Sequence, residues 1–195
     1  MIRAPLAASI VTIMVWTVPA FAQTAVDHLG IPGPIPMGGT AYELAWSSQP
    51  TPAYTKQEYL PDGARPESYE SMVLVEFLAT DRPLSDVVSA QVAMVQQRKP
   101  GDPVANVAIM QNADKSEFLL DFLMSTKDAK GEFIVEWNGY RYVAAEHDGR
   151  PGALLFAVSE RAYGNEASQA FLQSLKAFKA ERIDALTAAD LPQPR

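Results

Sequence analysis

Alternation of apolar and polar residues predicts β-strands along most of the chain. The alternation begins between Tyr42 and Trp46, which would share one face of a strand, and a returning strand is expected over 54–60. Residues 72–78 are apolar on both faces except at Glu76. A strand of that kind needs cover on both sides, so we expect it near the centre of a sheet.

The second half of the chain predicts further antiparallel strands, over 104–110, 117–125, 133–143 and 153–160. Asn138-Gly139 divides the third of these runs, and Asn-Gly is the preferred sequence of a two-residue type I′ turn, in which both residues need positive φ. We therefore expect a hairpin there, with Glu136 opposite Arg141 on one face and aromatic residues opposite each other on the other. A second turn is expected at 147–152.

Two segments have the period of an amphipathic helix. The first covers 83–98 and buries a stripe that includes Val88; the second begins at Asn165, expected as its cap, buries Phe171 and weakens after Leu186. Hairpin-linked strands with helices at separate points predict an α+β fold. We expect a mostly antiparallel sheet of about 6–7 strands, with the mid-chain helix and the C-terminal helix packed on one side of it.

The first 22 residues have the order of a secretory signal peptide. Arg3 supplies a positive charge, a short apolar run follows, and Pro19 precedes a small-x-small sequence that ends at Ala22. Cleavage would leave Gln23 at the start of a mature chain in a bacterial periplasm. The alternative is an inner-membrane anchor formed by 4–22, although a spanning helix needs roughly 20 apolar residues.

The remainder divides into three parts. Residues 23–40 are rich in proline and glycine, which disfavour regular structure, and are expected as a lead-in to the domain. Residues 41–188 carry one continuous pattern without an internal repeat, typical of a single domain. A proline-bearing tail over 189–195 closes the chain.

Composition narrows the classes of function. The chain has 16 basic and 23 acidic residues, for a net charge of −7, and cleavage would also remove Arg3. Such a surface repels phosphate backbones and anionic lipids, so neither nucleic acid nor, after cleavage, a membrane is an expected partner. The chain contains no cysteine, which excludes disulfides and thiolate chemistry, and its two histidines, His28 and His147, fall in segments expected at the surface. We expect no cofactor and no metal.

The chain resembles the PsbP-like family of small exported α/β/α sandwich domains. The resemblance rests on the sequence 59–63 (YLPDG) before a strand, the helix over 83–98, and the closing segment 170–178 (AFLQSLKAF). It covers roughly residues 40–182 at the level of topology and loose pattern. Such domains are generally non-catalytic binding or assembly modules, which is what the resemblance implies here.

Candidate chemistry is confined to carboxylates that interrupt apolar strands. Glu76 and Asp121 do so, and if their strands are neighbours the two could share a half-covered sheet face with Glu136 and Arg141. Like charges brought together would raise the pKa of one carboxyl, as acid–base chemistry or cation binding requires. The other interpretation is that these charges keep an open face wet and oppose aggregation.

No catalytic motif is present, so no catalytic residue is predicted. The favoured hypothesis is a periplasmic, non-enzymatic accessory or binding domain that docks an envelope protein or a small ligand against its sheet. Tyr54, Tyr59 and Tyr69 precede the central strand and are the expected contacts, because interfaces favour aromatic residues. The alternative is a small periplasmic hydrolase or cation-dependent enzyme built on Glu76 and Asp121.

Overall fold

The structure is a computed structural model that describes residues 25–114 and 116–195. The predicted signal peptide, with its cleavage point between Ala22 and Gln23, lies outside the described residues. The elements are β1 (Ile35–Met37), β2 (Thr40–Thr51), β3 (Tyr54–Leu60), β4 (Ser71–Ala79), α1 (Leu84–Arg98), β5 (Asn106–Gln111), β6 (Glu117–Lys127), β7 (Phe133–His147), β8 (Arg150–Tyr163) and α2 (Asn165–Ala188). No helix in the described part of the chain is long and apolar enough to cross a membrane.

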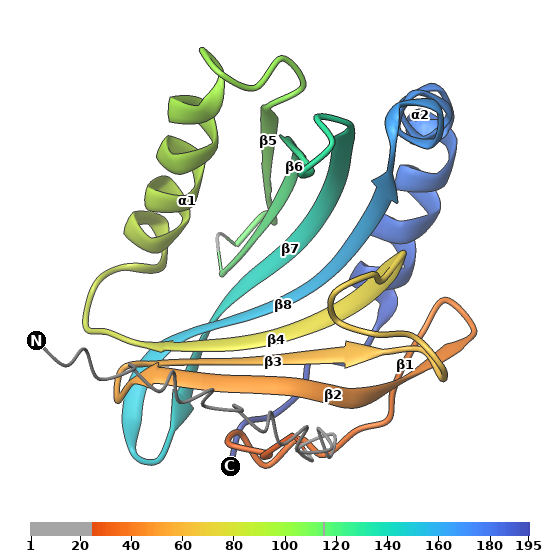
Figure 1. Ribbon diagram of the computed structural model, residues 1–195. Coiled ribbons are helices and arrows are strands. Elements are labelled where there is room, and N and C mark those ends of the chain that lie inside the picture. Colours follow the sequence, from red (N-terminus) through yellow and green to blue (C-terminus); the bar gives the residue numbers. More distant parts are fainter. Residues whose placement is uncertain (1–24, 115) are drawn as a thin grey trace, which may run out of the picture.

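All the strands in the described part of the chain belong to one antiparallel sheet. Its order is β1-β2-β3-β4-β8-β7-β6-β5, and the sheet curls strongly along its length (Figure 1). Residues 25–114 and 116–195 contribute eight strands to this sheet, so the expectation of about 6–7 was wrong. One reason is that β1 forms within the proline- and glycine-rich segment, where composition argued against regular structure.

The two helices pack on opposite faces of the sheet. Leu119 and Leu154 belong to the core beneath α2, whereas the next residues along the same strands, Leu120 and Leu155, belong to the core beneath α1. Adjacent residues of a strand point to opposite faces, so both faces of these strands are apolar and each needs a cover. The expectation that both helices lie on one side was therefore wrong.

The expected Asn-Gly hairpin does not form. Asn138 lies in the middle of β7, where it pairs with Phe122 of β6 and Ser159 of β8. The turn lies at Asp148-Gly149, with φ of 51° and 69°, so that both residues have the positive φ of a type I′ turn. Partners on both sides of a long central strand outweigh the local turn preference of the dipeptide.

The expected lead-in, 23–40, is part of the core over its described residues. Leu29 is completely buried, and its backbone N–H donates to the side-chain oxygen of Gln57 at 3.0 Å. The Tyr59 hydroxyl donates to the Ile31 carbonyl at 2.6 Å. Polar side chains of β3 thus satisfy backbone groups of the part of this segment that precedes β1.

The expected tail, 189–195, is also attached to the domain. Leu191 packs against the core beneath α2, and the backbone N–H of Arg195 donates to the Leu29 carbonyl at 3.0 Å. Arg141 on β7 donates from Nη1 to the carbonyls of Leu186 and Ala189, each at 2.9 Å. These carbonyls belong to the C-terminal end of α2, whose last turn has no basic residue of its own.

Candidate functional site

The four charged residues expected on one sheet face are divided between the two faces. Glu76 accepts a hydrogen bond from Tyr140 on the α1 side, and Glu136 shares that face of β7 with Tyr140. Asp121 accepts hydrogen bonds from Trp137 Nε1 and from Lys179 Nζ of α2, at 2.7 Å and 2.6 Å. The hypothesis of an active site shared by Glu76 and Asp121 is therefore wrong. Alternation assigns faces only within one strand, and the pairing between strands decides which residues meet.

The predicted Glu136–Arg141 pair is also absent. Glu136 forms an ion pair with Arg161 and accepts a hydrogen bond from the Tyr69 hydroxyl at 2.8 Å. Arg141 pairs with Glu117, with 2.5 Å between its Nε and a carboxylate oxygen. Each of these charges is neutralised within the fold, which argues for a structural role.

Two of the three expected tyrosine contacts are inaccessible. Tyr59 is 0% exposed and Tyr69 is 3% exposed. Burial raises the pKa of both hydroxyls well above the ordinary value, so both stay protonated and donate hydrogen bonds. Of the three, only Tyr54 is partly exposed, and it lines a cavity.

That cavity, the Glu76 pocket, has a volume of about 520 Å³ and lies between α1 and the sheet. Glu76 is 6% exposed and accepts hydrogen bonds from Tyr54 at 2.5 Å and from Tyr140 at 3.1 Å. Tyr142 also lines the pocket, and its hydroxyl is buried without a hydrogen-bond partner among the described residues. Burial, reinforced by the charge of Glu76, raises the pKa of the Tyr54 and Tyr142 hydroxyls well above the ordinary value.

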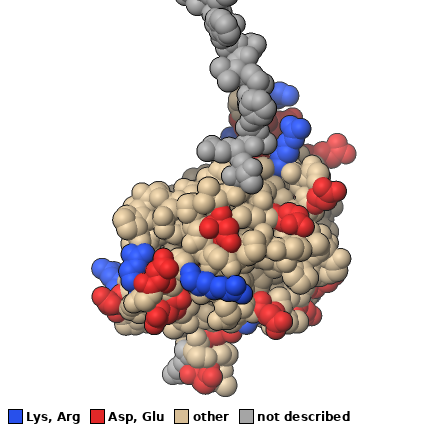
Figure 2. Space-filling view, turned by 90° about the horizontal axis from the view of Figure 1, so that it is seen from below, with Lys and Arg blue, Asp and Glu red and all other residues tan. Residues whose placement is uncertain are grey.

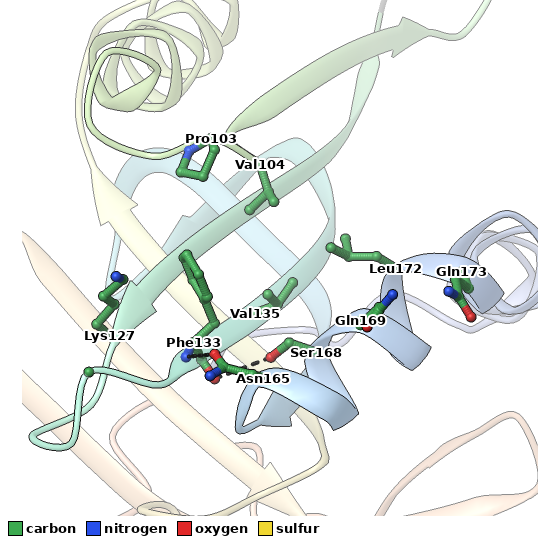
Figure 3. Close-up of a pocket in the computed structure, with 11 residues that line it drawn as sticks. Pro103, Val104, Lys127, Phe133, Val135, Asn165, Ser168, Gln169, Leu172 and Gln173 are labelled. Atoms are coloured by element: carbon green, nitrogen blue, oxygen red, sulfur yellow. Dashed lines mark hydrogen bonds between the residues drawn. The ribbon is translucent and has the colours of Figure 1, made fainter.

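A second cavity, the α2 pocket, has a volume of about 630 Å³ and lies on the other face of the sheet. In Figure 3 its walls come from three parts of the chain: the loop after α1, the end of β6 with the start of β7, and the first turns of α2. The apolar lining is Pro103, Val104, Phe133, Val135 and Leu172, and the polar lining includes Lys127, Asn165, Ser168, Gln169 and Gln173.

Hydrogen bonds hold the floor of the α2 pocket in place. The backbone N–H of Phe133 donates to Asn165 Oδ1 at 3.0 Å, and Ser168 Oγ donates to the Phe133 carbonyl at 3.2 Å (Figure 3). The N-cap of α2 is Gly164, so Asn165 joins the helix to β7 and does not cap it as expected. Lys127 Nζ lies 4.9 Å from the centroid of the Phe133 ring, a cation–π contact.

The sequence did not indicate either pocket. The pattern predicts a strand at Phe133 and a helix at Leu172, but it does not indicate that the two elements form a cavity between them. A sequence feature that could have drawn attention is Lys127, a cation a few residues before Phe133 at the junction of two strands.

His147 was expected at the surface but is 4% exposed, at the end of β7, with its ring 5.3 Å from that of Phe77. Within residues 25–114 and 116–195 no group of three or more histidine or acidic residues could hold a metal ion. On the face drawn in Figure 2, acidic and basic side chains lie interspersed, with broad uncharged areas between them.

Comparison with known sequences agrees with the boundaries of the folded unit. A protein-family model matches residues 29–191, and no curated protein matches the sequence. The match begins at the fully buried Leu29 and ends at Leu191, which packs against the same core. It covers most of the chain and all of the sheet, and the chain therefore belongs to this family, which is uncharacterised.

Proposed function

We propose that this chain is an exported, non-enzymatic binding domain whose α2 pocket takes a small amphiphilic ligand with an anionic end. The preformed apolar cavity of about 630 Å³ is the observation that carries the proposal. Binding sites for small molecules are typically concave, mostly apolar and about 300–1,000 Å³ in volume, with a few polar groups that orient the ligand. The α2 pocket has each of these properties.

The polar groups at its mouth favour an anionic end on the ligand. Lys127 is exposed and is the only charged residue among those that line the pocket. Asn165, the first residue of α2, also lines the pocket, and the partial positive charge of a helix N-terminus favours anions. An apolar body would lie against Phe133, Val135 and Leu172, with its charged group toward Lys127.

The likeness to PsbP-like domains belongs to the same proposal. The likeness is supported by a helix on each face of one antiparallel sheet and by the segment 59–63 that precedes β4. A binding or assembly role outside the cytoplasm is what that resemblance implies. The sequence order from Arg3 to Ala22 is the support for export.

The anionic apolar fluorophore 8-anilinonaphthalene-1-sulfonate provides a direct test. We expect saturable 1:1 binding to the native chain and roughly tenfold weaker binding to Leu172→Glu, because the new carboxylate would lie in the cavity and repel the sulfonate. Lys127→Gln should weaken binding about threefold, as expected for one exposed charge. Fluorescence titration of the folded proteins measures both.

Ser174→Glu is the matched control, since Ser174 is exposed on the same helix and does not line the pocket. It adds the same charge and should leave the titration unchanged. Equal weakening by Leu172→Glu and Ser174→Glu would show that the fluorophore responds to net charge and does not enter the pocket, and the proposal would fail.

Export is tested separately. Expressed from its own start codon in a Gram-negative bacterium, the chain should be recovered from the periplasmic fraction with Gln23 as its first residue. The control is Ala22→Arg, which removes the small residue that signal peptidase needs and should leave the full-length chain attached to the membrane fraction. An intact N-terminus at Met1 in the unaltered chain, recovered from the cytosol, would contradict export.

A further inference from the structure

The charge of Glu76 lacks a cationic partner in the described part of the chain. Glu76 is 6% exposed, yet none of the ion pairs found there includes it. Burial of a charge is costly unless a partner of opposite sign compensates it. Asp121, Glu136 and Glu160, which are also buried or half-buried, each have a lysine or arginine partner among the described residues, and Glu76 differs from them in this respect.

Hydrogen bonds satisfy this carboxylate only in part. Tyr54 and Tyr140 each donate one hydrogen bond to it, while the two oxygens of a carboxylate can accept about four. Tyr142 is 1% exposed and lines the same cavity, but its hydroxyl reaches no hydrogen-bond partner among the described residues. A buried hydroxyl without a partner is rare in a native fold and needs an explanation.

We propose that the Glu76 pocket binds the primary ammonium group of an alkylamine. An ammonium would supply the positively charged partner that Glu76 lacks. Its three N–H groups would donate hydrogen bonds to the carboxylate and to the Tyr142 hydroxyl oxygen. The rings of Tyr54 and Tyr142 line the site and attract a cation through their faces.

The rest of the pocket suits the alkyl chain. Leu78, Val87 and Leu155 line it alongside Glu76, so an apolar stem would be removed from water while its charged end pairs. Arg82 and Asp86 also line the pocket, and both are exposed and carry opposite charges. This site lies on the opposite face of the sheet from the α2 pocket, so the inference does not depend on the proposed function.

Isothermal titration of the full chain with n-butylammonium chloride tests the site, with 1-butanol as the uncharged analogue. We expect saturable 1:1 binding of the ammonium and none of the alcohol. Glu76→Gln keeps the shape and removes the charge, and should weaken binding at least about tenfold. Glu146→Gln removes the same charge from an exposed position of β7 and should bind as the unaltered chain does.

Tyr142→Phe provides a second variant whose folding is not in question, because its hydroxyl makes no hydrogen bond to lose. It should weaken ammonium binding about threefold or more through loss of one acceptor. Failure of the unaltered chain to bind n-butylammonium saturably would overturn the proposal. Equal binding by the unaltered chain and both pocket variants would overturn it as well.

A free amine and a lysine side chain share this chemistry, and a further probe distinguishes them. Nα-acetyl-lysine amide presents the same alkylammonium on a peptide unit. If it binds more tightly than n-butylammonium and loses affinity in Glu76→Gln, the proposal holds and the natural source is a lysine of a protein partner. If n-butylammonium binds more tightly, the proposal holds with a free amine.

Discussion

Replacement of Gly152 by alanine is expected to lower the free energy of unfolding by about 3 kcal/mol. Gly152 pairs with Ala79 of β4, and a Cβ on it would lie 2.3 Å from the Leu78 carbonyl oxygen and 2.8 Å from the Phe77 ring. The oxygen belongs to the backbone, so relief requires β4 and β8 to separate where both are central strands. Urea denaturation, followed by tryptophan fluorescence, measures the change as a lower midpoint at unchanged slope.

Gly101→Ala is the control for this prediction. The nearest atom to a Cβ there is 4.0 Å away, and neither glycine has a positive φ, so neither substitution strains the backbone and only the one at Gly152 meets a close atom. The control should change stability by no more than about 0.5 kcal/mol. Equal midpoints for the two variants would mean that β4 and β8 are not as closely apposed as described.

Arg141→Leu is expected to cost about 3 kcal/mol, because it leaves polar groups without their partner. Arg141 is 8% exposed, and its guanidinium bonds both to Glu117 and to three carbonyls at the end of α2. Leucine fills much of the volume but leaves the carboxylate and these carbonyls without a donor. Thermal unfolding measures the loss, and hydrogen exchange should show faster opening of the last turn of α2.

Lys56→Leu is the matched comparison for this second prediction. Lys56 also forms a close ion pair, 2.7 Å from Glu58, but the side chains are 28% and 13% exposed. Pairs of this kind contribute about 0–1 kcal/mol. If Arg141→Leu is no more destabilising than Lys56→Leu, the guanidinium does not hold α2 to the sheet.

Individual elements could be predicted where the local signal and the tertiary context agree. The helix expected over 83–98 is α1, and the strand expected over 72–78 is β4, which pairs on both sides. In both segments the apolar residues that form the buried surface are close together in the sequence, so their spacing is enough to predict the element. The Asn-Gly prediction failed because a dipeptide contains no information about the strands that flank β7.

The sites could not be predicted, because they depend on how distant segments align. The sequence correctly shows that Glu76 and Asp121 interrupt apolar runs in β4 and β6. Whether the two side chains lie on the same face of the sheet depends on the pairing of β4 with β8, β8 with β7 and β7 with β6. Tyr59 and Tyr69 are tyrosines, a residue type that is enriched at interfaces. Their burial follows from the N-terminal segment and from Glu136, neither of which is adjacent in sequence.

The hydrogen bond between Arg195 and Leu29 has a practical consequence for engineering. It holds the two ends of the folded unit close together, so a short glycine linker could join them and make the backbone circular. The chain could then be reopened at Asp148-Gly149, the exposed tip between β7 and β8. Such a circular permutant would keep every strand pairing while moving the free ends to the far end of that hairpin.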